Sequence, residues 1–161
     1  MKLVRIVFAL GGVLPWARAL LDRELPLSSK LAVDRAFAAL CHHLPERTLA
    51  PGGAPMCVCS RCAGVYAGVM LAALWPTGLL PPPRTLRRAL EIGLSVMALD
   101  IVTQDLALHP PWHLVRLATG LWVGGALTAW MLSEIARQRF RATLSRATHS
   151  AFDKASVARP A

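Results

Sequence analysis

The feature that most constrains this chain is a long uncharged apolar stretch that begins directly after a cysteine-rich segment. Residues 63–80 carry no charged side chain over 18 positions, and residues 114–132 form a second apolar stretch interrupted only by Arg116. A run of about 18 or more apolar residues is long enough for a helix to cross a bilayer. Because 55% of the residues are hydrophobic although only 6% are aromatic, we predict an all-α integral membrane protein.

Two further segments are weaker candidates for membrane spans. Residues 89–106 contain three acidic residues, but their apolar residues keep helical spacing. Residues 3–14 follow Lys2, are interrupted by Arg5, and lack a small-residue cleavage site before Pro15. We therefore expect an uncleaved first span rather than a removed signal peptide, and a polytopic bundle of about four transmembrane helices.

The distribution of basic residues predicts how the spans are oriented. The connection 81–88 contains three arginines, whereas residues 103–113 contain no Lys or Arg. Short loops rich in Lys and Arg stay in the cytoplasm, so both termini are expected to be cytoplasmic. The Cys/His-rich loop 40–62 then becomes extracytoplasmic, which in a bacterium means a periplasmic loop on a protein of the cell inner membrane.

The formal charge of +9 does not indicate nucleic-acid binding. The basic residues flank apolar segments, and no face that combines aromatic and basic side chains accompanies them. The lipid bilayer is therefore the expected partner. We divide the chain into a membrane helical domain, residues 1–136, and a basic cytoplasmic tail, residues 137–161, which we expect to be disordered near anionic headgroups.

A cluster of cysteines and histidines predicts a metal site. Cys41, Cys59 and Cys62 have C-x17-C-x2-C spacing, and His42 or His43 can complete a set of three sulfurs and one nitrogen. Such ligands suit a divalent ion, zinc above all. Four protein ligands would make the site structural, whereas fewer would leave a position for an activated water. The sequence leaves this choice open.

Other interpretations of the cysteines also remain open. An oxidising compartment favours two disulfides among four cysteines, and C-x-x-C is also the spacing of redox dithiols. Some of the cysteines could instead be unpaired packing residues. The sequence does not decide whether Cys57 joins the cluster.

Charged residues near the cluster predict an anion site. Guanidinium groups suit phosphate or carboxylate, and Glu46 and Thr48 beside Arg47 have a structural alternative as an ion-pair partner and a turn cap. The candidate anion-binding or substrate-binding residues are Arg47, Arg61, Arg116 and His113.

Polar residues within the third span predict a second part of the site. Asp100 and Gln104 lie four residues apart, hence on one helix face, and ionisable groups in membranes are costly without a partner. We expect Arg116 to pair with Asp100, either to lock two spans together or as part of the site. The candidate catalytic residues are Asp100, His43 and Gln104.

Two pairs of glycines predict how the spans pack. Gly64 with Gly68, and Gly120 with Gly124, have the small-xxx-small spacing of closely packed membrane helices. We therefore expect the second and fourth spans to be neighbours. Near the cytoplasmic end of the third span, Glu91 is expected to be neutralised by arginines one turn away.

Four sequence blocks resemble a known family. They are Cys41-His42-x-x-Pro45-Glu46-Arg47-Thr48, Cys59-x-Arg61-Cys62-x-Gly64-x-Tyr66-x-x-Val69, Asp100-x-x-Thr103-Gln104 and Arg116-x-x-Thr119-Gly120. This pattern is similar to the bacterial and archaeal membrane family called domain of unknown function 2085, over about residues 40–125. The resemblance implies an integral membrane protein and no particular reaction. The chain departs from the pattern at two places. It has Ile101 where the family has glycine, and it has Pro-Trp-His at residues 111–113 where the family has a Ser-Thr-Asn run.

These features lead to three functional expectations. The first is a small metalloenzyme that acts on a lipid headgroup or another amphiphilic anion. The second is a non-enzymatic membrane subunit or metal carrier whose metal or disulfides staple the outer loop. The third is a thiol redox protein that uses Cys59 and Cys62.

Overall fold

The computed structural model describes residues 2–41, 44–51, 53–108, 110 and 112–157, with the backbone alone for Thr77 and residues 147–157. Within these ranges the fold is all-helical, as expected, and contains no strand. The α-helices are α1 (Lys2–Leu20), α2 (Leu27–Ala38), α3 (Ser60–Leu74), α4 (Pro83–Asp105) and α5 (His113–Val157), and two 3₁₀ helices are η1 (Pro45–Arg47) and η2 (Thr77–Leu79).

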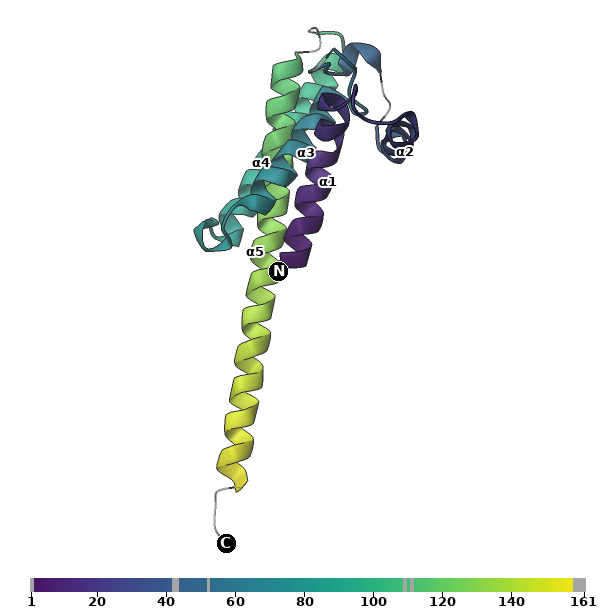
Figure 1. Cartoon of the computed structure of the whole chain (residues 1–161). Helices are drawn as coiled ribbons and strands as arrows, with labels where there is room; N and C mark the ends of the chain where they lie inside the picture. Colours follow the sequence, from purple (N-terminus) through teal and green to yellow (C-terminus); the bar gives the residue numbers. More distant parts are fainter. Residues whose placement is uncertain (1, 42–43, 52, 109, 111, 158–161) are drawn as a thin grey trace.

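Helices α1, α3, α4 and α5 run alternately up and down beside one another (Figure 1). Helices α3 and α5 form the central pair, with α1 packed on α3 and α4 packed on α5. We call one end of this bundle the cluster end, because the segment between α2 and α3 and the connection between α4 and α5 both lie there. The amino-terminal end of α1 and the connection between α3 and α4 lie toward the opposite end.

Glycines allow α3 and α5 to touch backbone to backbone. A Cβ atom added at Gly64 would lie 2.1 Å from the carbonyl oxygen of Leu117, and one at Gly120 would lie 2.2 Å from that of Arg61. Gly68 and Gly124 make equally close approaches. The prediction that these two helices pack through their small residues is therefore confirmed.

Helix α1 is fixed on α3 by three features. Gly12 allows a close approach, since an added Cβ would lie 2.6 Å from the carbonyl oxygen of Tyr66. The indole N–H of Trp16 donates to the carbonyl oxygen of Ala63 at 3.1 Å. Near the other end, Nε of Arg5 donates to the carbonyl oxygen of Ala73 at 2.7 Å, which satisfies one of the last carbonyls of α3.

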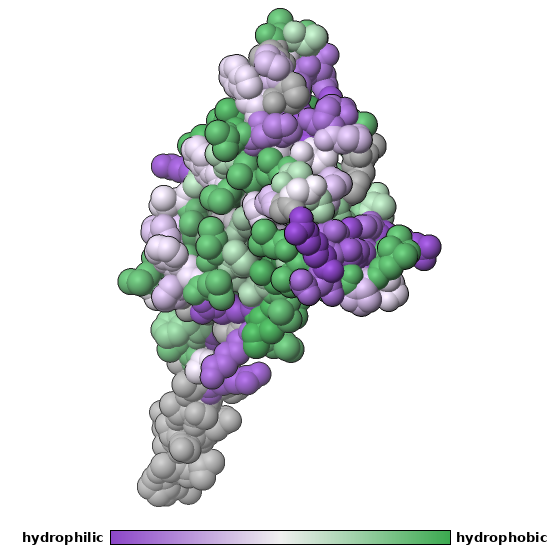
Figure 2. All heavy atoms as spheres, turned by 45° about the horizontal axis from the view of Figure 1, so that its top comes forward, coloured by the Kyte–Doolittle hydropathy of each residue, from purple (hydrophilic) through white to green (hydrophobic). Residues whose placement is uncertain are grey.

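By length and composition, two helical segments among the described residues are able to cross a membrane. They are Lys2–Leu20 and His113–Arg146, while Ser60–Leu74 is a shorter apolar helix. Helix α3 ends at Leu74 because Pro76 follows closely, and α4 carries several charged residues. On this measure the described residues contain two candidate spans, so the four expected spans are not confirmed. Figure 2 shows hydrophobic side chains exposed over the visible face of the bundle, interspersed with hydrophilic ones.

The segment expected to be a disordered tail is helical as far as Val157. Helix α5 continues without interruption through residues 137–157 and extends well beyond the other helices (Figure 1). This segment contains four Ala and four Arg residues and no Gly or Pro. Good helix formers without a breaker allow a helix to propagate.

Candidate metal and anion site

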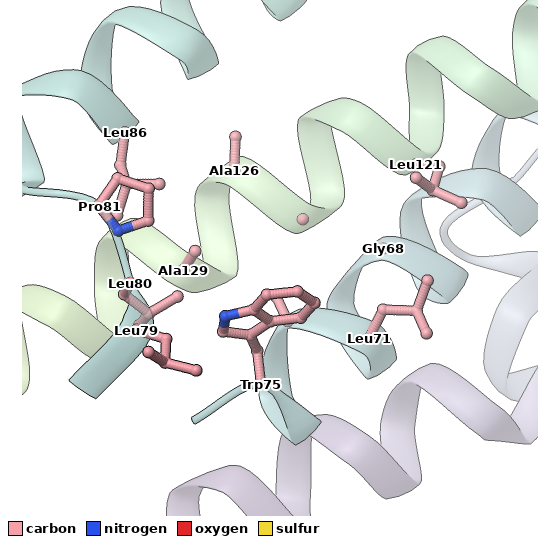
Figure 3. A pocket seen from close by; sticks show the side chains of 12 residues that line it. Gly68, Leu71, Trp75, Leu79, Leu80, Pro81, Leu86, Leu121, Ala126 and Ala129 are labelled. Carbon is pink, nitrogen blue, oxygen red and sulfur yellow. The ribbon is translucent and has the colours of Figure 1, made fainter. Parts of the chain in front are cut away.

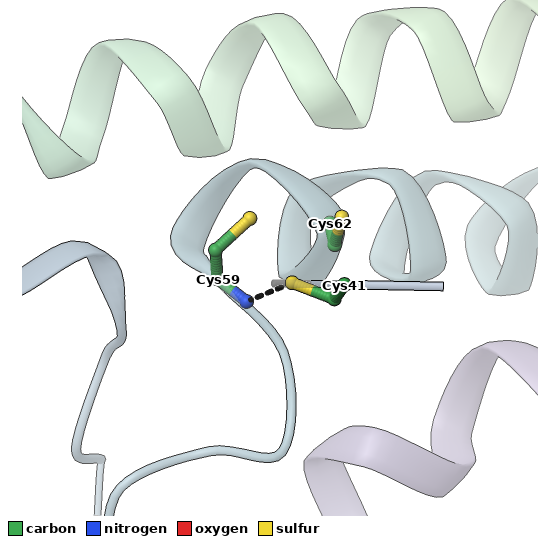
Figure 4. A group of neighbouring side chains, drawn as sticks. All are labelled: Cys41, Cys59 and Cys62. Atoms are coloured by element: carbon green, nitrogen blue, oxygen red, sulfur yellow. Dashed lines mark hydrogen bonds between the residues drawn. The ribbon is translucent and has the colours of Figure 1, made fainter. Parts of the chain in front are cut away.

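Three cysteine sulfurs converge at the cluster end. Those of Cys41, Cys59 and Cys62 all lie within 4.8 Å of one another (Figure 4). Sulfur ligands of tetrahedral zinc lie about 3.8 Å apart, given Zn–S bonds of about 2.3 Å. The cluster is therefore close to the spacing that one metal ion requires, and we call it the thiol cluster.

Local backbone structure brings these cysteines together. Cys41 lies three residues beyond Ala38, the last residue of α2, and its backbone N–H donates to the carbonyl oxygen of Phe37 at 3.0 Å. Cys59 is the N-cap residue of α3, and Cys62 lies in the first turn. The C-x-x-C spacing thus places two thiols at the start of one helix, and the third comes from the other side of the loop.

Backbone hydrogen bonds hold the loop around the thiol cluster. The N–H of Cys59 donates to the sulfur of Cys41 at 3.2 Å, a bond that stabilises a thiolate or a metal-bound sulfur. Thr48 and Cys59 form an isolated antiparallel bridge, and the N–H of Met56 donates to the carbonyl oxygen of Leu49 at 2.9 Å. The hydroxyl of Thr48 donates to the carbonyl of Pro45 at 2.7 Å, which confirms its role as a turn cap.

The four thiols have different environments, and all are free of disulfides. Cys57 is buried in an apolar core with Ala19, Phe37, Met56 and Val58, and burial raises its pKa to about 11. It is therefore a packing cysteine. By contrast, the hydrogen bond with the Cys62 thiol lowers the pKa of Cys59 to about 5, although desolvation acts in the opposite direction.

A cavity of about 440 Å³ brings the thiol cluster together with all three predicted arginines. The cationic side chains come from separate elements, since Arg47 ends η1, Arg61 lies in the first turn of α3 and Arg116 lies in the first turn of α5. We call this space the thiol–arginine cavity. Its lining residues are Leu40, Cys41, Leu44, Arg47, Cys59, Arg61, Cys62 and Arg116.

Asp100 pairs with Arg61, not with Arg116 as the sequence analysis expected. The expectation relied on the short connection between α4 and α5, but the first turn of α3 lies against α5, where the carbonyl oxygen of Arg61 meets Gly120. The Arg61 side chain therefore reaches Asp100 from α3. Arg116 is 2% exposed and forms no ion pair with the described residues.

The remaining candidate residues do not line the thiol–arginine cavity or lie outside the described residues. His42 and His43 lie outside the described residues. Gln104 is half-buried and does not line the thiol–arginine cavity. His113 begins α5, and its Nδ1 is buried without a hydrogen-bond partner among the described residues, but it does not line the cavity either.

Sequence reasoning missed two apolar residues of the site, Leu40 and Leu44, which line the cavity. The signal was present, because both flank the Cys41-His42-His43 segment. Leucines beside a polar segment become part of a binding site only where the fold directs their side chains into the cavity. The sequence alone does not reveal that turn.

A second cavity, of about 340 Å³, lies between α3, α5 and the connection to α4 (Figure 3). It is apolar and includes none of the predicted site residues. Small residues such as Gly68, Gly125 and Ala129 alternate there with Leu71 and Trp75.

The fold and the site together define a class, namely an all-helical chain with helices of transmembrane type and a thiol–arginine cavity at one end. The chain belongs to the DUF2085 family, described as predicted membrane proteins, whose family model matches residues 41–130. These residues include the three cysteines and the three arginines of the cavity. The resemblance inferred from the four sequence blocks is therefore confirmed.

Two archaeal relatives are similar to this chain. An uncharacterized protein of Methanocaldococcus jannaschii is 29% identical over 103 residues, which are 60% of this chain and 64% of the relative. An uncharacterized protein of Methanothermobacter thermautotrophicus is 34% identical over 90 residues, which are 55% of this chain and 80% of the relative. The match thus spans just under two thirds of the first relative. No solved structure matches the chain.

Proposed function

We propose that this chain is a membrane protein with four spans and an extracytoplasmic metal centre. The up-and-down arrangement of α1, α3, α4 and α5 supports this topology (Figure 1). It places the segment before α3 and the connection after α4 at one end of the bundle, and the connection between α3 and α4 at the other end. The arginine-rich start of α4 would lie in the cytoplasm of the cell inner membrane, together with both termini. The thiol cluster would then face the periplasm or the cell exterior.

The metal centre of this proposal uses Cys41, Cys59 and Cys62 as ligands of a zinc-like ion. Their sulfurs already lie within 4.8 Å of one another, and the N–H bond to Cys41 provides the outer support that metal-bound sulfurs commonly receive. The fourth position distinguishes two roles. His42 as fourth ligand would close the site, whereas a water or a substrate oxygen would leave it open for catalysis.

The function that this geometry supports best is a metal-dependent one directed at an amphiphilic anion, such as a lipid headgroup. The observation that carries it is that three thiols and three arginines line the same cavity. In this role the arginines hold negative charge beside the metal, which acts as a Lewis acid or activates water. Asp100 holds Arg61 in place through their ion pair. The roles of Asp100, His43 and Gln104 in moving a proton stay predictions.

Metal analysis of purified full-length protein tests the centre. We expect about one zinc-like ion per chain, and loss of that ion in Cys41→Ser, Cys59→Ser and Cys62→Ser. Cys57→Ser is the matched control, because that thiol is packed in the apolar core and should leave the metal content unchanged. Parent protein without metal, or cluster variants that keep it, would overturn the metal centre.

A thiol redox protein is the second candidate, favoured by the free thiols of Cys59 and Cys62 at the start of α3. Forming a disulfide between them would release two electrons and two protons to a disulfide oxidant. Mass spectrometry after oxidation and reduction separates the candidates. A reversible Cys59–Cys62 bond in metal-free protein favours the redox role, and stoichiometric metal with both thiols ligated favours the metal centre.

A further inference from the structure

The thiol–arginine cavity holds more positive charge than its surroundings neutralise. Arg47, Arg61 and Arg116 line it, and among the described residues only Arg61 has a carboxylate partner, Asp100. The lining contains no acidic residue. Arg47 and Arg116 therefore have no carboxylate partner among the described residues, although Asp100 and Cys59 act on Arg116 electrostatically, and Arg61 is held in position beside them.

We propose that this cavity binds the phosphate group of an amphiphile, with Arg47, Arg61 and Arg116 around the phosphate and Leu40 and Leu44 against the adjoining apolar chain. This inference rests on the proposed function, since it names the ligand class of the same site. The chemical group is a tetrahedral phosphate, whether carried by a lipid or free in solution.

The arrangement of the arginines favours phosphate over carboxylate. A carboxylate has two oxygens in one plane and is satisfied by one bidentate guanidinium. A phosphate presents three or four acceptor oxygens in different directions. Because the guanidinium groups come from η1, α3 and α5, they approach the cavity from separate elements and match a tetrahedral acceptor.

The burial of Arg116 indicates a missing acceptor. This side chain is 2% exposed, lines the cavity, and has its Nε buried without a hydrogen-bond partner among the described residues. The Nε of Arg61 is buried and unpartnered in the same way. Buried donors to which nothing bonds are costly, and one phosphate between the two arginines would satisfy both.

The first turn of α3 adds a second attraction for an anion. Cys59, Arg61 and Cys62 all line the cavity, so the amino terminus of this 15-residue helix borders it. The backbone N–H groups of Arg61 and Cys62 hydrogen-bond to the Cys59 sulfur, so this terminus attracts an anion in the cavity through the positive end of its helix dipole.

The apolar part of the ligand is inferred from Leu40 and Leu44. Both line the same cavity as the arginines, yet their exposed fractions are 69% and 39%. A free phosphate would make no use of these side chains, whereas the glycerol and acyl portion of a lipid would cover them. This combination favours a lipid phosphate at the membrane surface over a soluble ion.

Calorimetric titration of the full-length protein in detergent tests the inference with three probes. They are short-chain phosphatidic acid, inorganic phosphate, and octanoate as an amphiphilic carboxylate. We expect phosphatidic acid to bind most tightly, phosphate more weakly and octanoate least. Phosphate binding as tight as that of phosphatidic acid would assign a soluble source to the same chemistry, and octanoate binding equal to phosphatidic acid would overturn the phosphate assignment.

Variants locate the binding. Arg116→Gln should weaken phosphatidic acid binding roughly tenfold or more, as expected for the loss of a charged hydrogen bond. Arg47→Gln, which alters a residue outside the helix contacts, provides the same test if Arg116→Gln does not fold. Arg84→Gln, an exposed residue in the first turn of α4, is the matched control and should bind normally. Unchanged affinity in Arg116→Gln or Arg47→Gln would overturn the inference.

Metal content measured on the same samples separates this inference from the proposed function. Parent protein that binds phosphatidic acid but contains no metal would contradict the metal centre and retain the phosphate site. Parent protein that contains metal but shows no preference for phosphate would contradict the phosphate site and retain the metal centre. Leu44→Ser should weaken phosphatidic acid binding and leave inorganic phosphate binding unchanged.

Discussion

The carboxylate of Asp100 on α4 forms an ion pair with the guanidinium of Arg61 on α3. The side chains are 8% and 16% exposed, so both charges lie largely away from water. The pair links two helices that each pack mainly on other partners, α3 on α1 and α5, and α4 on α5. It also fixes one of the three arginines that line the thiol–arginine cavity.

Removing one partner of this pair should destabilise the protein strongly. Asp100→Asn would leave the Arg61 charge buried without compensation, and we expect a loss of roughly 3 kcal/mol in the free energy of unfolding. Unfolding in mixed micelles measures it. The control is Glu91→Gln, because Glu91 pairs with Arg87 at 2.9 Å while the side chains are 58% and 71% exposed. That exposed pair should contribute only about 0.5 kcal/mol or less. Equal effects of the two substitutions would contradict a structural role for Asp100.

The sequence predicted the composition of the site better than its connections. The spacing of Cys41, Cys59 and Cys62 predicted that their three sulfurs lie together, which is confirmed, while their role as metal ligands stays a prediction. The partner of Asp100 was predicted incorrectly, since the choice between Arg61 and Arg116 depends on how the helices are rotated against one another. Local sequence does not determine that rotation.

Helix boundaries show the same limit. The glycine pairs predicted the α3–α5 contact because only small residues allow such close approach. By contrast, α2 (Leu27–Ala38) was not anticipated, because its mixture of Ser, Lys, Asp and Arg with apolar residues gives no membrane signal. It is held instead by tertiary contacts, in which Arg18 bonds Asp34 at 3.0 Å and Phe37 packs edge-on against Tyr66. Contacts between distant residues are not visible in a local pattern.

Adding a methyl group between α3 and α5 should force them apart. In Gly64→Ala the new Cβ would lie 2.1 Å from the carbonyl oxygen of Leu117, a backbone atom that cannot rotate away. We expect a loss of roughly 1–3 kcal/mol in stability. Thermal unfolding in detergent measures it, with Gly11→Ala as control.

Gly11 suits this control because a Cβ there meets nothing within 4 Å. Gly11 also lies inside α1, where alanine favours the helix by roughly 0.5–1 kcal/mol over glycine. The control should therefore be neutral or slightly stabilising. Similar losses at Gly64 and Gly11 would mean that the two helices do not touch as described.

Replacing Ala107 with glycine should stabilise the protein. Ala107 has φ of 55° just after α4, and its N–H donates to the carbonyl oxygen of Gln104 while that of Leu108 donates to Thr103. This is a Schellman-type helix end, at which glycine is preferred because a side chain crowds the left-handed conformation. We expect a gain of roughly 1 kcal/mol, measured by thermal unfolding. A loss of stability would contradict this helix end.

Removal of the metal should destabilise the parent protein more than a cluster variant. A ligand that binds only the folded state at about 100 times its Kd contributes about 2.7 kcal/mol, so a chelator should lower the Tm of metal-loaded parent protein. Cys59→Ser, which lacks one thiol of the cluster, should show little response to the same chelator. A Tm that falls equally in both proteins would show that the chelator acts elsewhere.

Reporter fusions test the orientation of the bundle. The connection after α4 and the connection before it lie at opposite ends (Figure 1), so in the proposed four-span topology only one of them is exported. Because Arg84, Arg87 and Arg88 lie in the first two turns of α4 while its other end has no arginine, the positive-inside rule places Leu108 outside and Pro82 in the cytoplasm. An alkaline phosphatase inserted after Leu108 should be active, and one inserted after Pro82 should be inactive. The reverse pattern would place the thiol cluster in the reducing cytoplasm, where free thiols need no metal to remain unpaired.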